Sequence, residues 1–238
     1  MPSVAGSKKL KRQMAPMFWG ISRKRPRFVT TVRPGPHGKN VSIPTAVFLR
    51  DTLKLVTTSR EAKYAIYNGK VKVDGVPRKS IHHGIGLMDV IELDGISDAY
   101  RMVPGQGHIL HPIKIKAAEK SVKLVKVTSK VTNKKGKTQI GFHDGRSLLS
   151  DTKVSVGDSC LMQVPEQKIN EVIKLEKGTR VLVTKGINAG QLGEIKEIKE
   201  GTFVLPKRAL LSFGDREIEI PAELVMAVGK KEPIIQIA

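Results

Sequence analysis

Cysteine, aromatic residues and long apolar runs are all scarce in this 238-residue sequence. Cys160 is its one cysteine, which excludes an internal disulfide and a metal cluster built on cysteines, and a cytoplasmic location is expected. Aromatic residues make up 4% of the chain, so its cores must be mostly aliphatic. No run approaches the roughly 20 apolar residues of a membrane-spanning helix. No apolar stretch follows the basic N-terminal residues, so a signal peptide is not expected.

Acidic residues are missing from the start of the chain. The first 50 residues contain eleven Lys or Arg and no Asp or Glu, in a chain whose net charge is +20. Because such a chain repels itself, a polyanionic partner is expected, and we favour nucleic acid over an anionic membrane.

Residues 1–42 are predicted to form an extended basic arm that becomes ordered against phosphates, since prolines interrupt it and its charges oppose compaction. Phe18 is expected to pin the arm to its own domain. For Trp19, pinning and stacking on an RNA base both stay open. The candidate RNA-binding residues of the arm are Lys8, Lys9, Lys11, Arg12, Arg23, Lys24, Arg25, Arg27, Arg33, His37 and Lys39.

Two short helices are predicted after the arm. Apolar residues recur at helical spacing over Thr45–Val56. A capping box at Thr58–Glu61 then predicts a second helix over Ser59–Asn68. This helix is expected to bury Ala62 and Ile66.

A small sheet is expected next, with strands at Val71–Val73 and Leu87–Leu93 and a hairpin turn at Asp74–Gly75. The string from Ser59 to Gly75 resembles the S-four-type RNA-binding domain, which implies that RNA lies along the paired helices and nearby loops. By this resemblance the candidate contacts are Arg50, Lys54, Arg60, Lys63, Lys70, Arg78 and Lys79.

The middle of the chain alternates as short strands, for example at Val122–Val127 and Thr138–Phe142. For the basic loop between them, gripping phosphate and merely connecting strands are equal readings, and its candidates are Lys134, Lys135 and Lys137. His143 and Asp144 are interpreted as part of a turn rather than an acid–base pair, because adjacent strand residues point to opposite faces.

A glycine-punctuated loop between two strands marks the C-terminal part, and glycines allow positive φ and close backbone approach. The segment Gly178–Ile195 resembles a KOW motif, which implies a small SH3-like barrel whose loop touches RNA or protein. Strands at Thr202–Leu205, Glu217–Ile220 and Leu224–Val228 are expected to complete it. The loop candidates are Lys185, Gly186, Asn188, Gly190, Gln191 and Gly193.

In this order the segments resemble the archaeal and eukaryotic small-subunit ribosomal protein S-four-e family over essentially the whole chain. Further matching motifs are Leu10-Lys11-Arg12, Pro34-Gly35-Pro36-His37, Ser42-Ile43-Pro44 and His143-Asp144-Gly145-Arg146. Lys9 stands where the family often has His. The chain ends soon after Lys230-Lys231 without the basic tail of eukaryotic members, so an archaeal source is expected.

The resemblance implies a structural constituent of the small ribosomal subunit that binds ribosomal RNA, contacts neighbouring ribosomal proteins and supports assembly and translation. The predicted fold is multidomain and mainly β with a small α+β module. Its parts are the extended basic arm (1–42), the S-four-type domain (43–105), a central β domain (106–176) and the SH3-like KOW barrel (177–238).

An enzyme is not expected, because no set of residues forms a catalytic constellation and no Gly-rich cofactor loop follows a strand and opens a helix. No cofactor, metal, membrane or small-molecule substrate is predicted. The alternatives are an RNA-modifying enzyme targeted by an S-four-type domain and a KOW-containing transcription elongation factor.

Overall fold

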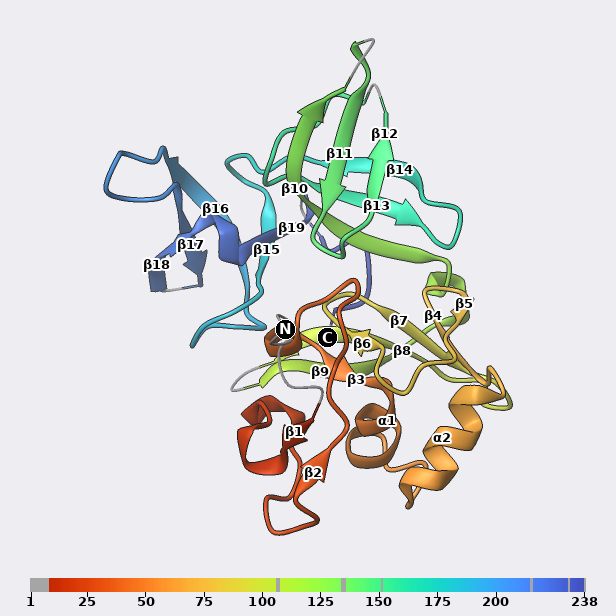
Figure 1. The fold of residues 1–238 in the computed structure, drawn as a ribbon. Helices are drawn as coiled ribbons and strands as arrows, with labels where there is room; N and C mark the ends of the chain where they lie inside the picture. The colour runs from red at the N-terminus through yellow and green to blue at the C-terminus, as the bar shows by residue number, and fades with distance from the viewer. Residues whose placement is uncertain are drawn as a thin grey trace, which may run out of the picture.

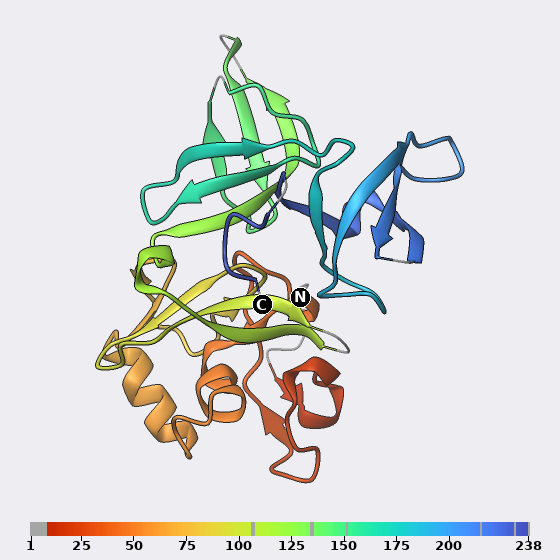
Figure 2. The same ribbon diagram turned by 180° about the vertical axis from the view of Figure 1, so that it is seen from behind.

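The computed structural model describes residues 9–105, 108–133, 136–150, 152–214, 216–230 and 232–237. The fold is mainly β, as predicted, and its described strands form antiparallel sheets. Figure 1 shows three lobes, and Figure 2 shows them from behind. We call them the N-terminal lobe (residues 9–115), the central sheet (122–173) and the C-terminal sheet (180–229). None of the described helices has the length and apolar character to span a membrane.

The described helical segments are all short, and α2 (Ser59–Tyr67) is the longest of them. The others are η1 (Arg12–Met14), η2 (Met17–Trp19), η3 (Lys39–Val41), α1 (Thr45–Val47), the π-helical η4 (Phe48–Thr52), η5 (Ala117–Glu119) and η7 (Ala222–Leu224).

Residues 9–42 pack against the rest of the N-terminal lobe, which corrects the prediction of an extended arm. Strand β1 (Leu10–Lys11) pairs with β2 (Phe28–Val29), and η1 and η2 lie between them. The prolines and the positive charge of the segment misled the prediction. Met14, Met17 and Phe28 are exposed, but six other apolar residues of the segment face one core. They are Leu10, Ala15, Phe18, Trp19, Ile21 and Val32.

Phe18 and Trp19 both pin this segment to the lobe. Phe18 is buried in the shared core, as predicted. Trp19 is 2% exposed, and its Nε1–H donates to the backbone oxygen of Ser42 over 2.9 Å. Of the two roles considered for Trp19, the structure therefore supports packing.

The helical part of the N-terminal lobe follows the sequence pattern closely. Helix α1 and η4 together end at Thr52, a few residues before the predicted Val56. At α2 the capping box is present: the Glu61 N–H donates to Thr58 Oγ1 over 3.2 Å, and the Thr58 N–H donates to Glu61 Oε2 over 3.4 Å. Ala62 and Ile66 are fully buried, as predicted.

The sheet of this lobe is larger than predicted. Asp74 and Gly75 both have positive φ, 52° and 73°, as a two-residue type I′ hairpin turn requires. The boundary predicted after residue 105 is wrong, because it falls in a hairpin whose second strand stays in the sheet. The sheet has the order β5 (Val76–Pro77), β4 (Val71–Val73), β7 (Val90–Leu93), β8 (Ala99–Gly105), β9 (His108–Ile115), and β3 (Ile43–Pro44) pairs separately with β6 (Gly84–Ile85).

The central sheet contains the two predicted strands. His143 and Asp144 lie in the turn after β11, which confirms the turn interpretation. The sheet order is β12 (Ser147–Leu149), β11 (Thr138–Phe142), β10 (Val122–Thr132), β13 (Ser159–Gln163), β14 (Lys168–Ile173).

The C-terminal sheet differs from the prediction at one strand. Thr202–Leu205 is an exposed loop, and the strand expected there lies later, at Arg208–Phe213. Gly201 and Pro206 bracket the apolar residues of that loop and favour a turn over a strand. The order is β18 (Arg216–Pro221), β17 (Arg208–Phe213), β16 (Leu192–Lys199), β15 (Arg180–Val183), β19 (Val225–Gly229).

The three lobes share buried surface. Met88 and Val103 of the N-terminal lobe and Leu124 of the central sheet belong to one core with the C-terminal sheet. The chain then returns to the N-terminal lobe, where the fully buried Arg101 donates to the Gln236 backbone oxygen over 3.0 Å. The lobes are therefore tied together by apolar packing and by the returning C-terminal segment.

Candidate nucleic-acid interface

A basic groove of about 220 Å³ lies between the β1–β2 hairpin and the start of α2. Three arginines from two different parts of the chain line it, together with hydroxyl groups at the helix start. Guanidinium groups and hydroxyls are the donors that proteins place around RNA phosphates. The lining residues are Arg12, Arg25, Pro26, Phe28, Val29, Thr30, Arg50, Thr57 and Ser59.

Arg12 forms the floor of this groove from inside the fold. Its Nε donates to the Pro26 oxygen over 2.9 Å and its Nη1 to the Ser22 oxygen over 3.2 Å. Burial, and then the positive charge of Arg50, lower the pKa of Arg12. Because Arg12 is only 5% exposed, its first role is to hold the hairpin, which corrects its assignment as an open RNA contact.

Arg23 and Arg50 are also engaged within the chain. Arg23 Nη1 donates to the backbone oxygens of Arg12, Gln13 and Ala15. Arg50 Nη2 donates to Asp51 over 2.6 Å, and its Nη1 donates to Ser59 Oγ over 2.6 Å. Arg50 is thereby aimed at the helix start, with part of its charge offset by Asp51.

An exposed aromatic ring lies at the edge of the groove. Phe28 is 48% exposed, and the Lys9 ammonium and Arg27 guanidinium lie 5.9 Å and 5.4 Å from its ring centroid. An aromatic face bordered by cations suits a nucleobase with its phosphate.

Helix α2 turns a second aromatic and basic face to solvent. Arg60, Lys63, Tyr64 and Tyr67 recur at the three- and four-residue spacing that places side chains on one helix face. All four are exposed, with Tyr64 at 69% and Tyr67 at 49%. The Lys63 ammonium lies 5.4 Å from the Tyr67 ring centroid. This face and the groove both include the first turn of α2.

Two glycines of the predicted KOW segment, Gly190 before β16 and Gly193 within it, lie close to their own chain. A Cβ at Gly190 would lie 2.7 Å from the Pro104 oxygen, and one at Gly193 would lie 2.8 Å from the Phe213 ring. The close backbone approach at these two glycines therefore serves packing inside the protein, whereas a Cβ at Gly186 would meet nothing within 4 Å. The contact of the loop with RNA or protein stays a prediction. Lys185 and Ile187 are exposed, the latter at 96%.

Sequence reasoning missed a buried ionic cluster where the N-terminal lobe meets the central sheet. The fully buried Lys123 of β10 forms ion pairs with Asp74 (2.8 Å), Asp89 (2.6 Å) and Asp144 (3.1 Å). His37 Nε2 lies 3.1 Å from Asp89, and Arg146 Nη2 lies 2.7 Å from Asp74. His37, predicted to contact RNA, is 6% exposed and belongs to this cluster instead.

Asp89 and Lys123 are held in their charged forms. Burial alone would raise the pKa of Asp89, but the Lys123 ammonium and His37 hold it far below its usual value. Burial alone would likewise lower the pKa of Lys123, but the surrounding carboxylates raise it. The alternation along Val122–Val127 predicted the strand but not this cluster, because one sequence cannot show three aspartates converging from other segments.

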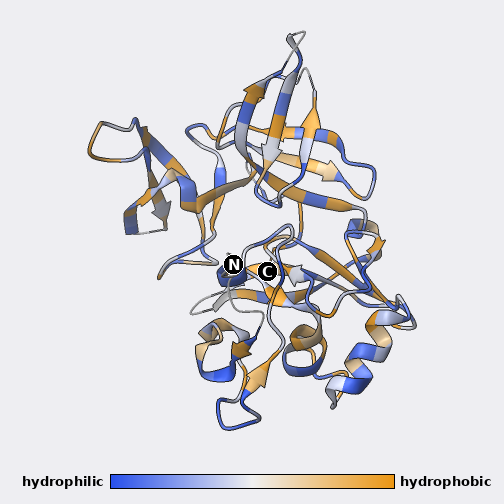
Figure 3. Ribbon diagram, in the orientation of Figure 1, coloured by the Kyte–Doolittle hydropathy of each residue, from blue (hydrophilic) through white to orange (hydrophobic). Residues whose placement is uncertain are grey.

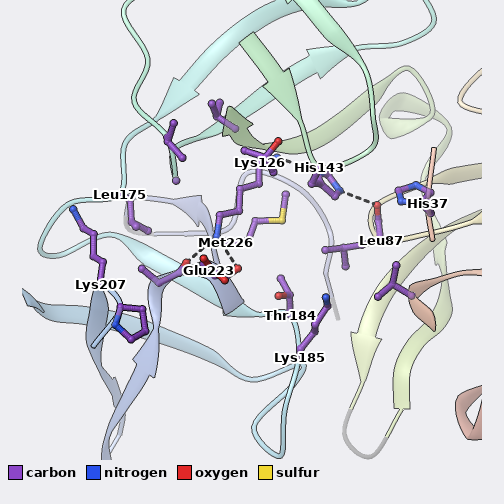
Figure 4. A pocket seen from close by; sticks show the side chains of 17 residues that line it. His37, Leu87, Lys126, His143, Leu175, Thr184, Lys185, Lys207, Glu223 and Met226 are labelled. Atoms are coloured by element: carbon purple, nitrogen blue, oxygen red, sulfur yellow. Dashed lines mark hydrogen bonds between the residues drawn. The ribbon is translucent and has the colours of Figure 1, made fainter. Parts of the chain in front are cut away.

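A cleft of about 510 Å³ opens between the central and C-terminal sheets (Figure 4). Lys126 extends along it and donates to the backbone oxygens of Ala222, Glu223 and Val225. Burial lowers the pKa of Lys126 to about 8. Next to Lys126, whose backbone N–H donates to His143 Nδ1 over 3.1 Å, burial and then the charge of Lys123 lower the pKa of His143 to about 4. The side chains of Lys126 and His143 therefore connect separate segments of the chain.

Comparison with known proteins gives the family. Residues 96–169 match the model described as "Ribosomal family S4e", and residues 5–40 match the "RS4NT (NUC023) domain". The Small ribosomal subunit protein eS4 of Methanothermobacter thermautotrophicus is 37% identical over all of this chain and 98% of its own length. The protein of that name from Ignicoccus hospitalis is 39% identical over the same shares.

The chain belongs to the S4e family.

A solved structure agrees with this membership. The crystal structure of the 30S ribosomal protein S4e from Thermoplasma acidophilum matches with a TM-score of 0.69 and 35% identity, covering 81% of this chain and 97% of that one. The S4e family resemblance seen in the sequence is therefore confirmed. Since S4e proteins are ribosomal proteins, the prediction that the chain is not an enzyme is confirmed as well. The organisms named are archaea, in agreement with the expected source.

The remaining predicted contacts of this S4e protein lie mostly in the open. Lys8, Lys134 and Lys135 fall outside the described residues. Arg78, Asn188 and Gln191 are half-buried. The exposed candidates besides those of the groove and the α2 face are Lys11, Lys24, Arg33, Lys39, Lys54, Lys70, Lys79, Lys137 and Lys185.

Proposed function

We propose that this chain is a structural constituent of the small ribosomal subunit that binds ribosomal RNA with the basic groove and the outward face of α2. The observation that carries the proposal is that cations of the N-terminal segment and of η4 line one groove with the start of α2. Arg25 and Arg50 line one groove although they come from separate segments, and exposed aromatic rings border it. Its RNA-binding lobe is proposed to be an S-four-type domain, and its C-terminal sheet an SH3-like KOW barrel.

Cations and aromatic rings of the two surfaces are expected to contribute to RNA binding in different ways. The cations displace counterions from phosphates, which makes affinity strongly dependent on salt. Side chains cannot read the deep groove of duplex RNA, so the register comes from RNA shape and from unpaired bases that stack on exposed rings. We also propose that the protein contacts neighbouring ribosomal proteins and is located in the cytoplasm.

The groove is tested with the exposed pair Arg25→Glu and Arg27→Glu. Affinity for a small-subunit ribosomal RNA transcript is measured by filter binding across a range of KCl concentrations. The slope of log K against log salt should fall by about one for each phosphate that is no longer neutralised, or about two for the pair.

A matched control reverses two lysines far from the groove, Lys196→Glu with Lys199→Glu on β16. This control should keep the salt slope of the unaltered protein. If both double variants behave alike, the charge effect is general and the groove is not the RNA-binding surface.

The assembly itself is tested by sedimentation of cell lysate. The protein should travel with small ribosomal subunits. Migration with RNA polymerase would favour an elongation factor. In a separate incubation of the purified protein with RNA and S-adenosylmethionine, the formation of modified nucleosides would favour an RNA-modifying enzyme.

A further inference from the structure

One part of this basic protein is acidic. Residues 194–223, which form most of β16, then β17, β18 and their connections, contain seven Asp or Glu and five Lys or Arg, against +20 for the whole chain. We call this segment, which is a part of the C-terminal sheet and not a further lobe, the acidic lobe. A phosphate backbone is attracted to the rest of the protein but gains nothing from the net charge here.

Most cations of the acidic lobe are already paired. Lys196 forms an ion pair with Glu217, and Lys199 lies 3.4 Å from Glu219. Arg208 lies 2.8 Å from the same Glu219, and Lys207 lies 2.7 Å from Glu200. Such exposed pairs add little stability, but they offset the charges that an RNA contact would need.

The acidic lobe ends in an apolar tip. In the loop 201–206 the side chains of Phe203, Val204 and Leu205 are 106%, 82% and 46% exposed. Figure 1 shows this loop projecting from the C-terminal sheet away from the other lobes, and its outer part is hydrophobic in Figure 3. Large apolar side chains gathered on a surface and rimmed by polar residues mark interaction sites.

The tip has a defined conformation. The Thr202 N–H donates to the Leu205 oxygen over 2.8 Å, and the Leu205 N–H donates to Thr202 Oγ1 over 3.2 Å. A Cβ at Gly201 would lie 2.9 Å from the backbone nitrogen of Lys207, so the two ends of the loop lie close together. A loop organised in this way loses less conformational entropy on binding.

We propose that the loop 201–206 is a protein-docking tip that inserts Phe203 and Val204 into an apolar pocket on a partner protein with a basic surface. The inference rests on the proposed function, since the partner is then a neighbouring protein of the small subunit. Aromatic anchors that fill pockets dominate the energetics of protein interfaces. A basic rim on the partner complements the acidic lobe around the tip.

A photo-crosslink distinguishes protein from RNA as the occupant. The photoreactive amino acid p-benzoylphenylalanine replaces Phe203 in the tagged full chain, and small subunits purified from those cells are irradiated. The expected product is a protein adduct that survives ribonuclease and disappears on proteolysis. An RNA adduct, or no adduct, overturns the proposal.

The same residue placed at Phe28 is the control, because the groove is expected to crosslink to RNA. Tagged protein that enters small subunits without a protein adduct at position 203 refutes only the docking tip. Tagged protein absent from small subunits refutes the proposed function and the docking tip with it.

A second test uses the double variant Phe203→Ala with Val204→Ala. Both side chains are exposed, so the melting temperature and the affinity for RNA alone should not change. Its release from salt-washed small subunits should be about tenfold faster, as expected when an anchor is removed. The matched control, Val131→Ala with Leu149→Ala, removes two exposed apolar side chains of the central sheet. Equal release of both double variants overturns the proposal.

Discussion

At the scale of single residues, Tyr64 is the most exposed aromatic side chain of α2, at 69%. It makes no contribution to the core, which Ala62 and Ile66 form on the opposite face. A ring in this position can stack on an unpaired base without any rearrangement of the helix.

Tyr64→Ala should therefore weaken RNA binding by about 1–3 kcal/mol, the usual value of one base–aromatic stack. The slope against salt should stay unchanged, because the variant still neutralises the same phosphates. Filter binding measures both quantities, and a changed slope with unchanged affinity would contradict the stacking role.

Substitution of the cations on the same face of α2 should change the salt slope, which Tyr64→Ala should not. Arg60→Glu with Lys63→Glu should lower RNA affinity and reduce the salt slope by about two. Thermal unfolding should shift little, because exposed substitutions usually stay within about 0.5 kcal/mol. Loss of the folded state in this variant would place the two residues in the core instead.

His143 makes stability depend on pH. Its pKa is about 4 in the folded protein, against an ordinary value of 6.5. Between these values the unfolded chain binds a proton that the folded protein refuses, so stability is complete above pH 6.5 and decreases toward pH 4. The groups around it are Lys123 and Asp144, and the His37 ring at 6.2 Å.

This residue should account for a loss of about 2 kcal/mol of unfolding free energy between pH 7 and pH 5. Urea unfolding at several pH values measures that loss, and His143→Gln should make the pH dependence shallower. The exposed His111→Gln is the control and should leave it unchanged. Parallel curves for the protein and His143→Gln would contradict the assignment.

At the scale of elements, the N-terminal segment is the part whose character the structure changes most. It carries the highest density of positive charge, yet it forms the β1–β2 hairpin and shares the core of the N-terminal lobe. Its cations remain at the surface or on backbone oxygens, while six of its apolar residues, Trp19 among them, point inward. It is therefore a structural element and a proposed RNA contact at once.

Trp19→Ala tests the structural half of that statement. The change removes a buried indole and its hydrogen bond to Ser42, which should cost about 3–5 kcal/mol of unfolding free energy. The neighbouring Met17→Ala is a matched control, because Met17 lies in the same turn and is 87% exposed. Equal and small losses in urea unfolding would mean that the segment does not pack as described.

At the scale of the whole molecule, the ionic cluster around Lys123 links three stretches of chain. Asp74 and Asp89 come from the N-terminal lobe, Asp144 from the central sheet and His37 from the N-terminal segment. Because the partners of Lys123 are buried, removal of its charge leaves three carboxylates with only Arg146 and His37 to offset them.

Lys123→Met should therefore destabilise the protein by about 3–5 kcal/mol, measured by urea unfolding. The control Lys116→Met removes an exposed lysine near the same junction and should change stability by less than about 0.5 kcal/mol. A stable Lys123→Met protein with its lobes still joined would show that apolar packing alone holds them.

Much of the local structure followed from local signals. The capping box at Thr58, the paired positive φ values at Asp74 and Gly75, and the turn at His143 each depend on a few adjacent residues. The family resemblance rested on motifs of the same kind. The strand predicted at Thr202–Leu205 failed because apolar composition without a packing partner does not specify a strand.

What the sequence determined by itself is the basic character, the mainly β composition, the short helices and the family, since each depends on composition or on neighbouring residues. Only the tertiary structure decided that Arg12 and His37 turn inward and that residues 9–42 pack against the rest of the N-terminal lobe. It alone also decided that Lys123 forms ion pairs with three aspartates. These features depend on contacts between residues far apart in the chain, and burial and charge pairing become defined only when the fold brings them together.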